Sequence, residues 1–225
     1  MNQKILFVSA TVPEAKVLEA VPGILLSEGV FKFRNLEITS LVTGLGAAAT
    51  AWSLMDWIGK NGKPDLAINS GIAGSYSENI HVGDVVLPYS DCFADAGIED
   101  DDEYLTLYEA KLADPDDFPF RGGVLFSTGE YARRLGSIVT PVKAITVNRA
   151  TGSEATLKNL RSKFNPDIET MEGATFFYIC CRENIPFLAL RSVSNKVEKR
   201  NRSSWNIPLA LNSLTVKLNE VLLIL

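Results

Sequence analysis

The sequence predicts one α/β domain built around a mixed sheet. Short apolar runs that fit buried strands alternate along the chain with longer segments whose apolar residues recur at the helical period of 3.6. No internal repeat and no linker rich in proline or serine divides the 225 residues. Since this length suits one large domain, we expect a single domain over residues 1–225.

The chain opens with a strand and a helix. Residues 5–8 form an unbroken apolar run, typical of a strand that is buried on both faces. Thr11 is a suitable cap for a helix that begins near Pro13, because proline is tolerated in a first helical turn. Residues 9–11 are therefore the first turn from strand to helix.

A hairpin and a second helix follow. Residues 31–34 and 36–43 fit the two strands of a hairpin that turns near Asn35. The next helix opens at Gly44-Leu45-Gly46, and its apolar positions follow the helical period up to Ile58. These glycines formally match the dinucleotide-binding pattern G-x-G-x-x-A. That pattern also requires an acidic residue at the end of the next strand, which would bind the ribose hydroxyls, and the next strand here has none. We therefore interpret the two glycines as a tight turn from strand to helix.

The remaining chain repeats the alternation. Residues 66–69 are a buried strand, which Ser70-Gly71-Ile72-Ala73-Gly74 then ends as a loop. This loop is either an ordinary connection or a place where backbone amides meet a ligand beyond the strand ends. The other expected strands are residues 84–88, 124–127, 142–148 and 187–194, and the other expected helices are residues 153–163, 172–183 and 207–225.

Composition and residue types exclude several classes of protein. The net charge of −5, without a concentrated basic patch, argues against a nucleic-acid partner. Cys92, Cys180 and Cys181 are odd in number and lack CxxC spacing, so we expect reduced thiols in a cytoplasmic protein. His81 is the single histidine, which argues against a metal site or a histidine-based triad. The longest uncharged stretch, residues 38–55, contains glycines, serines and threonines, so we expect no membrane span.

Three segments are candidates for chemistry or motion. Glu172, at a helix start, either interacts with the helix dipole or accepts hydrogen bonds from sugar hydroxyls, with Met171 beneath the ring. The buried strand that follows ends in an arginine, two hydroxyls and an amide, in the segment Arg191-Ser192-Val193-Ser194-Asn195. These polar side chains suit a bound polar ligand, and a solvated basic loop is the alternative explanation. Residues 95–103 are acidic and irregular, so we expect a solvated surface loop, with a mobile lid as the alternative.

Taken together, these motifs resemble the purine nucleoside phosphorylase and nucleosidase superfamily. The resemblance is carried, in chain order, by Ala10 and Glu14, Val42-Thr43-Gly44-Leu45-Gly46, Asn69-Ser70-Gly71-Ile72-Ala73-Gly74, Val82-Gly83-Asp84-Val85-Val86, Met171-Glu172-Gly173-Ala174 and Arg191-Ser192-Val193-Ser194-Asn195. It implies a three-layer α/β/α domain around a mixed, partly closed central sheet. It also implies a nucleoside site at the strand ends and a homo-oligomer.

Two departures from the family patterns concern the reaction and the base. Phosphorylases bind phosphate with a glycine- and arginine-bearing loop after the first strand, whereas this chain has Thr11-Val12-Pro13-Glu14 and no cation. A carboxylate there would repel phosphate but could activate water, which favours hydrolysis. Asn195 stands where methylthioadenosine-type nucleosidases carry an aspartic acid. Its amide can donate to a 6-oxo group, so we expect hypoxanthine or guanine as the leaving base.

A third feature points to the futalosine hydrolases within this superfamily. The chain resembles the basic and aromatic stretch of that family at Lys196-Val197-Glu198-Lys199-Arg200-Asn201-Arg202, which Trp205 follows. The family's substrate is an inosine derivative with a carboxyphenyl ketone at the 5′ end, and its pathway is menaquinone biosynthesis. Arg200 or Arg202 could clamp the carboxylate, and Trp205 could stack on the aryl ring. Methylthioadenosine nucleosidases, nucleoside phosphorylases and non-catalytic nucleoside-binding proteins are the alternatives.

The resemblance implies a role for each candidate residue. Glu14 is the expected general base that polarises the attacking water, and Arg191 orients the water or Glu14. Glu172 holds the ribose hydroxyls above Met171, and Asn195 binds the purine edge. The other expected substrate-binding residues are Ile72, Ala73, Gly74, Asn148, Arg200 and Trp205. Water is the expected co-substrate, and no metal or cofactor is expected.

Overall fold

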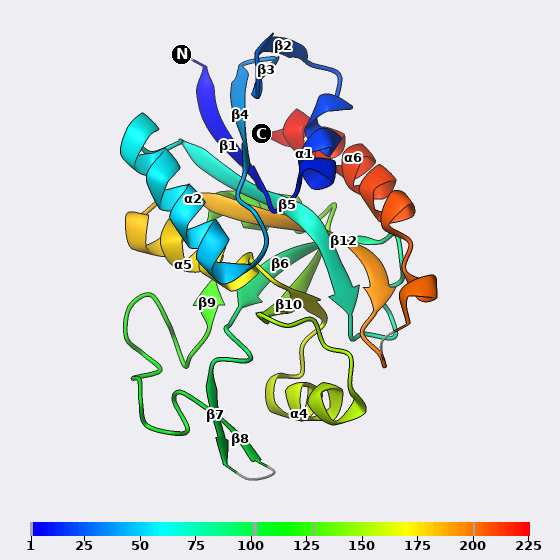
Figure 1. Ribbon diagram of the computed structural model, residues 1–225. Helices are drawn as coiled ribbons and strands as arrows, with labels where there is room; N and C mark the ends of the chain where they lie inside the picture. Colours follow the sequence, from blue (N-terminus) through cyan, green and yellow to red (C-terminus); the bar gives the residue numbers. More distant parts are fainter. Residues whose placement is uncertain (1, 101–102, 128, 200) are drawn as a thin grey trace.

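A computed structural model of the chain confirms the α/β fold. It describes residues 2–100, 103–127, 129–199 and 201–225, except for the side chains of Asp100, Glu103 and Arg202. A central sheet lies between helices on both of its faces, which gives the three expected layers (Figure 1). The helices are α1 (Val12–Glu19), α2 (Gly46–Asn61), α3 (Glu130–Leu135), α4 (Glu154–Phe164), α5 (Gly173–Glu183) and α6 (Ile207–Ile224), with a short 3-10 helix at Arg202–Ser204.

The sheet is mixed and partly closed. Its strand order is β11-β10-β6-β12-β5-β1-β4-β3-β2, and β9 pairs with β6. β11 pairs with both β10 and β5, so that β5, β12, β6, β10 and β11 form a closed ring. The strands are β1 (Gln3–Ser9), β2 (Ile24–Ser27), β3 (Val30–Phe33), β4 (Leu36–Val42), β5 (Leu66–Ser75), β6 (Val85–Asp91), β7 (Gly97–Asp100), β8 (Glu103–Thr106), β9 (Leu125–Phe126), β10 (Thr140–Thr146), β11 (Ile168–Thr170) and β12 (Phe187–Lys196).

The alternation of side chains along β1 explains the three layers. Ile5 and Phe7 point to one face and pack in a core cluster with α1 and α6. Leu6 and Val8 point to the opposite face and pack with α2 and α5. Because successive side chains of a strand alternate between faces, a strand that is apolar throughout must be covered on both sides.

Helix α6 belongs to this core. By length and composition alone it is long and apolar enough to cross a membrane. Leu214, Leu218 and Val221 are fully buried on the face that packs against α1 and the sheet. Another side carries an ion pair between Lys217 and Glu220. This amphipathic pattern is typical of a helix that covers a sheet in a globular protein.

β5 extends further than expected. Residues 70–74 were expected to form a loop, but they continue the strand to Ser75. β12 pairs with β5 along this stretch, and β11 pairs with its end on the other side. The prediction was wrong because the bulky apolar pattern stops at Asn69, while backbone pairing continues through small residues.

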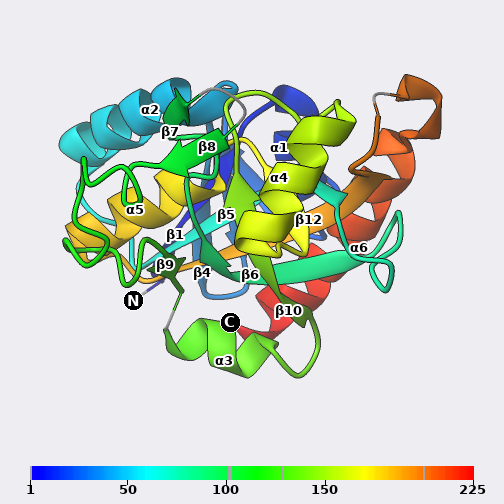
Figure 2. The same ribbon diagram turned by 90° about the horizontal axis from the view of Figure 1, so that it is seen from below.

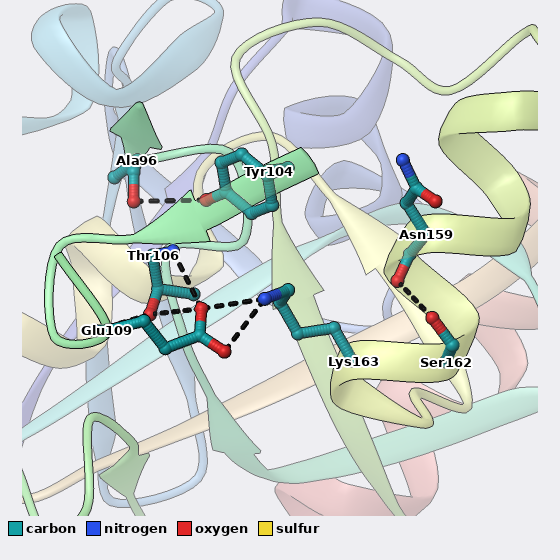
Figure 3. A network of polar contacts seen from close by, with 7 residues as sticks. All are labelled: Ala96, Tyr104, Thr106, Glu109, Asn159, Ser162 and Lys163. Atoms are coloured by element: carbon teal, nitrogen blue, oxygen red, sulfur yellow. Dashed lines mark hydrogen bonds and ion pairs between the residues drawn. The ribbon is translucent and has the colours of Figure 1, made fainter. Parts of the chain in front are cut away.

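The acidic segment 95–103 was also predicted wrongly as irregular. β7 and β8 form a hairpin there, although residues 101–102 lie outside the described part of the chain. Glu109 ties the hairpin to α4, because its carboxylate accepts hydrogen bonds from Thr106 and from Lys163 Nζ at 2.7 Å (Figure 3). These bonds lower the pKa of Glu109 to about 2. The ribbon views show the hairpin beside α4 (Figures 1 and 2).

Candidate active site

A cavity of about 420 Å³ lies at the carboxyl-terminal ends of β1, β5, β11 and β12. Ligands of open α/β sheets bind at such strand ends, and the volume is typical of a small-molecule site. The candidate residues that line it are Glu14, Ile72, Ala73, Gly74, Met171, Glu172, Asn195 and Trp205. Two acids and an amide that are distant in sequence, Glu14, Glu172 and Asn195, therefore share one cavity.

Glu14 is held in place from two sides. It lies in the first turn of α1, where a capping box with Thr11 forms: Thr11 N–H and Oγ1 donate to Glu14 Oε2 at 3.0 and 2.7 Å. From β5, Ile72 N–H donates to Glu14 Oε1 at 3.0 Å. Since a carboxylate oxygen can accept two hydrogen bonds, Oε1 keeps one acceptor position for a molecule in the cavity.

Glu172 stands at the N-terminus of α5. Its Oε1 accepts a hydrogen bond from Gly46 N–H at 2.8 Å. Gly46 has a φ of +83°, a left-handed conformation that favours glycine. The tight turn before α2 therefore presents a donor to the site. Burial raises the pKa of Glu172, and the nearby charge of Glu14 adds to this effect, while Gly46 and Arg191 oppose it.

The amide of Asn195 has a fixed orientation. Its Nδ2 donates to the Lys196 carbonyl at 2.8 Å, and a carbonyl can only accept, so the nitrogen must lie on that side. Its Oδ1 accepts from Ser194 Oγ at 2.8 Å. One N–H of Asn195 remains for a ligand. Gly74 lies next to it: a Cβ at Gly74 would come within 3.2 Å of Asn195 Nδ2.

Arg191 does not line the cavity. Its side chain is buried within the sheet and donates to the Asn69 carbonyl at 2.8 Å, to the Leu190 carbonyl at 3.0 Å and to Asn69 Oδ1. Burial lowers the pKa of Arg191, and the carboxylates of Glu172 and Glu14 act against this shift. Its geometry therefore suits an electrostatic and positioning role behind the acids, rather than a direct contact with water.

Two other candidates lie away from the cavity or outside the described residues. Asn148 is exposed and pairs with Asp95: its N–H and Nδ2 donate to that carboxylate at 2.6 and 3.0 Å. The structure therefore does not place Asn148 at the site, because its side-chain amide is bonded to Asp95 on the surface. Arg200 lies outside the described residues, as does the side chain of Arg202. Trp205, from the segment before α6, does line the cavity.

Sequence reasoning gave no role to a third cavity carboxylate, Glu169. Its Oε2 accepts from Tyr76 OH at 2.9 Å and from Thr151 Oγ1 at 2.5 Å, and its Oε1 accepts from Thr151 N–H at 2.9 Å. Burial raises the pKa of Glu169. The short strand Ile168-Glu169-Thr170 gave no local signal, because the partners of Glu169 lie 93 and 18 residues away in the sequence.

A further buried acid, Asp91, lies behind the site. Its Oδ1 accepts from Thr146 Oγ1 at 2.9 Å and from Cys92 N–H at 2.8 Å. Thr146 Oγ1 in turn accepts from Ala174 N–H, at the first turn of α5, at 2.7 Å. Complete burial raises the pKa of Asp91 to about 7. Nothing in the local sequence marks Asp91, because its burial results from the packing of α5 onto β6 and β10.

The cavity is strongly acidic. Glu14, Glu169 and Glu172 line it, and its described lining residues include no lysine, arginine or histidine. Such a surface repels an anion and stabilises a positive charge that develops in a bound molecule. Among the described residues, no group of histidines, cysteines and acids could hold a metal ion.

Comparisons with known proteins identify relatives of this chain. The sequence profile of the phosphorylase superfamily matches residues 5–222. A futalosine hydrolase from Thermus thermophilus is 29% identical over 223 residues, which cover 96% of this chain and 94% of that protein. A futalosine hydrolase from Acidothermus cellulolyticus is 32% identical over 181 residues, which cover 77% of this chain and 70% of that protein.

A solved structure adds a match in three dimensions. It is a variant of 5′-methylthioadenosine/S-adenosylhomocysteine nucleosidase from Helicobacter pylori with 5′-methylthioadenosine in the active site. It superposes on this chain with a TM-score of 0.81 at 18% identity, over 100% of both chains. At this identity the likeness concerns the fold. The profile match, which spans nearly the whole chain, shows that the protein belongs to the phosphorylase superfamily, among relatives that are N-glycosyl hydrolases.

Proposed function

We propose that this protein is a nucleosidase that hydrolyses the N-glycosidic bond of futalosine and releases hypoxanthine, a step of menaquinone biosynthesis. The observation that carries the proposal is the convergence of Glu14, Glu172 and Asn195 on one cavity. The two futalosine hydrolases that match most of the chain support the same substrate.

In the proposed reaction, Glu14 is the general base. The free acceptor position on Oε1 holds the attacking water, while the bonds from Thr11 and Ile72 keep the carboxylate from rotating. Water attacks the anomeric carbon as the bond to the base breaks, and Glu14 takes its proton. Arg191 fixes Asn69 and contributes positive charge behind the two acids, so it acts as a positioning residue.

The ribose binds between Glu172 and Met171. Backbone N–H groups of Gly46 and Met171 use only part of the acceptor capacity of the Glu172 carboxylate, which can therefore also accept bonds from ribose hydroxyls. The transition state resembles a ribosyl oxocarbenium ion, so the negative charge of Glu172 stabilises the transition state more than the neutral substrate. Asn195 donates its free N–H to the departing base and stabilises the negative charge that collects there; the base then takes a proton from solvent water, and Glu14 returns its proton to the solvent.

The acidic cavity favours water over phosphate as co-substrate. Phosphorolysis requires cations or a cluster of N–H donors that balance the phosphate charge. The described lining residues supply three carboxylates and no cationic side chain. A phosphate next to Glu14 would therefore be repelled.

The 5′ substituent extends toward an apolar end of the cavity. Trp205, Ile207 and Leu211, which line the cavity, supply the apolar side chains of this end, and the indole of Trp205 can stack on an aryl ring. Arg200, whose position is outside the described residues, is the proposed partner of the substrate carboxylate. The same apolar end also suits a methylthio group, which makes 5′-methylthioadenosine/S-adenosylhomocysteine hydrolysis the second candidate function.

A second copy of the chain is the proposed partner. Leu45, which lines the cavity, is 66% exposed, and Trp52 on the adjoining helix α2 is 74% exposed. Apolar surface next to a cavity rim is typical of an interface. We also propose that residues 1–225 form one domain and that the enzyme is cytoplasmic, where its free cysteines stay reduced.

Product analysis tests the proposal. The protein is incubated with futalosine in phosphate-free buffer and then in buffer with phosphate, and the free base is separated by chromatography. We expect hypoxanthine without phosphate and no gain when phosphate is added. Release that depends on phosphate would identify a phosphorylase, and adenine release from 5′-methylthioadenosine alone would identify the second candidate. Tight binding without any turnover would indicate a nucleoside-binding protein.

A further inference from the structure

We propose that Glu169 accepts the N1–H of the bound 6-oxopurine and so determines base specificity together with Asn195. The inference rests on the proposed function, because it assigns a contact to the base that this function releases. Glu169 is the one cavity carboxylate among the described residues that the proposed mechanism does not use.

The sheet places Glu169 and Asn195 on the two sides of the same glycine. Gly74 of β5 pairs with Glu169 of β11 on one side and with Asn195 of β12 on the other. Neighbouring strands lie about 4.8 Å apart, so the backbones of Glu169 and Asn195 are roughly 10 Å apart. Because Gly74 has no side chain, the side chains of Asn195 and Val197 lie directly over its backbone, and a planar base can bind beside them between Glu169 and Asn195. A Cβ at Gly74 would come within 2.8 Å of Val197 Cγ2 and 3.2 Å of Asn195 Nδ2.

The hydrogen bonds of Glu169 leave one acceptor position. Tyr76 OH and Thr151 Oγ1 occupy both acceptor positions of Oε2. Thr151 N–H occupies only one of the two acceptor positions of Oε1. These bonds hold the side chain rigidly at the cavity wall, and Arg161 extends the network by donating to the Tyr76 carbonyl at 3.0 Å. The remaining acceptor on Oε1 is therefore preorganised for an N–H donor.

This acceptor distinguishes the two classes of purine. Hypoxanthine carries a hydrogen on N1, whereas N1 of adenine has a lone pair. A 6-oxopurine would donate N1–H to Glu169 while its oxygen accepts from Asn195. Adenine would place its N1 lone pair against the carboxylate oxygen and its amino group against the Asn195 N–H. A site built from fixed, buried hydrogen-bonding groups discriminates strongly against such a mismatch.

The test compares Glu169→Gln with Glu109→Gln, the same change in a carboxylate that lies outside the cavity. Values of kcat/KM are measured for inosine and adenosine, and circular dichroism checks that each variant is folded. Thr151 N–H keeps the glutamine carbonyl at the Oε1 position, so the variant loses charge but retains a weak acceptor. We expect the inosine-to-adenosine ratio to fall about tenfold, since hydrogen bonds to charged groups are roughly twice as strong as neutral ones. Glu109→Gln should leave the ratio unchanged.

A second variant tests proximity to N1 directly. Wild type should hydrolyse 1-methylinosine poorly, because the methyl group meets the carboxylate. Glu169→Ala removes the obstacle, so the preference for inosine over 1-methylinosine should fall at least tenfold. Unchanged ratios in both folded variants would overturn the assignment of Glu169 while leaving the proposed function intact. If wild type releases no hypoxanthine from any nucleoside, the proposed function fails, and this inference fails with it.

Discussion

The carboxylate of Glu14 occupies the place that a side chain at position 71 would take. A Cβ added to Gly71 would lie 2.6 Å from Glu14 Oε1. Gly71 belongs to β5, whose next residue, Ile72, donates its N–H to the same oxygen at 3.0 Å. β5 therefore both binds and confines the carboxylate of the proposed general base.

Gly71→Ala should displace Glu14 without unfolding the protein. Gly71 does not have a positive φ, so alanine is compatible with the backbone, and the atom it meets is the end of a flexible side chain. Misplacing a catalytic group by about 1 Å commonly costs on the order of 10²-fold in rate, so we expect a loss of that size in kcat. Steady-state kinetics with futalosine measure it. Gly59→Ala is the matched control, because a Cβ there meets nothing within 4 Å. Equal kcat values for the two variants would contradict the proposed role of Glu14.

Glu14→Gln should abolish most turnover and also lower stability. Removal of a general base commonly costs about 10²–10⁴-fold in rate. Thr11 N–H and Ile72 N–H donate to different oxygens, and a glutamine amide can accept only at one of them. The buried donor that loses its partner should cost about 1–3 kcal/mol in the free energy of unfolding. Single-turnover kinetics and urea unfolding measure the two effects. Wild-type turnover in this variant would show that another group activates water.

Asn195→Asp should weaken the preference for 6-oxopurines. The new carboxylate would face the Lys196 carbonyl, which can only accept, so it must be protonated to bond there. Its single proton is then used, and no donor remains for the oxygen of hypoxanthine. We expect kcat/KM for inosine to fall at least tenfold, with adenosine less affected. The ratio of the two values is the readout, and an unchanged ratio would remove the main reason for choosing the leaving base.

Trp205→Ala should weaken binding of the 5′ end of the substrate and leave binding of the base and sugar unchanged. Trp205 lines the cavity near the start of α6, away from the acids in the proposed binding mode. Loss of aryl stacking should raise KM for futalosine about tenfold, while KM for inosine, which lacks the aryl group, changes little. Equal changes in both KM values would place the indole elsewhere than at the 5′ substituent.

The buried Asp91 should make stability depend on pH. Its folded pKa of about 7 lies above the ordinary value of 3.8, so between these pH values the folded state binds more protons than the unfolded state. The contribution of Asp91 to the free energy of unfolding should therefore fall as pH rises from 4 to 7, by about 1.4 kcal/mol per pH unit. Asp91→Asn keeps the Oδ1 acceptor for Thr146 but cannot titrate. Urea unfolding of both proteins at pH 5 and pH 8 measures the difference. We expect the asparagine variant to gain stability relative to wild type at pH 8, and parallel pH profiles would contradict the burial effect.

Much of the fold could be predicted from the sequence where the pattern is long and regular. The apolar run at residues 5–8 and the helical stripe of α6 both identify elements correctly, because burial dictates their residue types. Short elements such as β2 and α3 were missed, since four or six residues give too little periodicity. Backbone pairing extends β5 through residues 70–74, where side-chain patterns carry no signal.

The candidate site was predicted only in part, for a related reason. Glu14 and Glu172 follow strands directly, so sheet topology brings them to one edge. Asn148 also follows a strand, β10, yet its amide turns outward to Asp95. Arg191 pairs with Gly71, one residue before the first β5 residue that lines the cavity, Ile72, and its side chain is buried within the sheet. Glu169 could not be recognised, because its partners Tyr76 and Thr151 are 93 and 18 residues away.

The central claim is that the acids and the amide of this cavity hydrolyse a 6-oxopurine nucleoside with an aryl 5′ group. A competition assay tests it most directly: futalosine and 5′-methylthioadenosine are supplied together at equal concentration, without phosphate, and both free bases are quantified over time. We predict that hypoxanthine accumulates first and in large excess. Adenine released faster than hypoxanthine would contradict the claim.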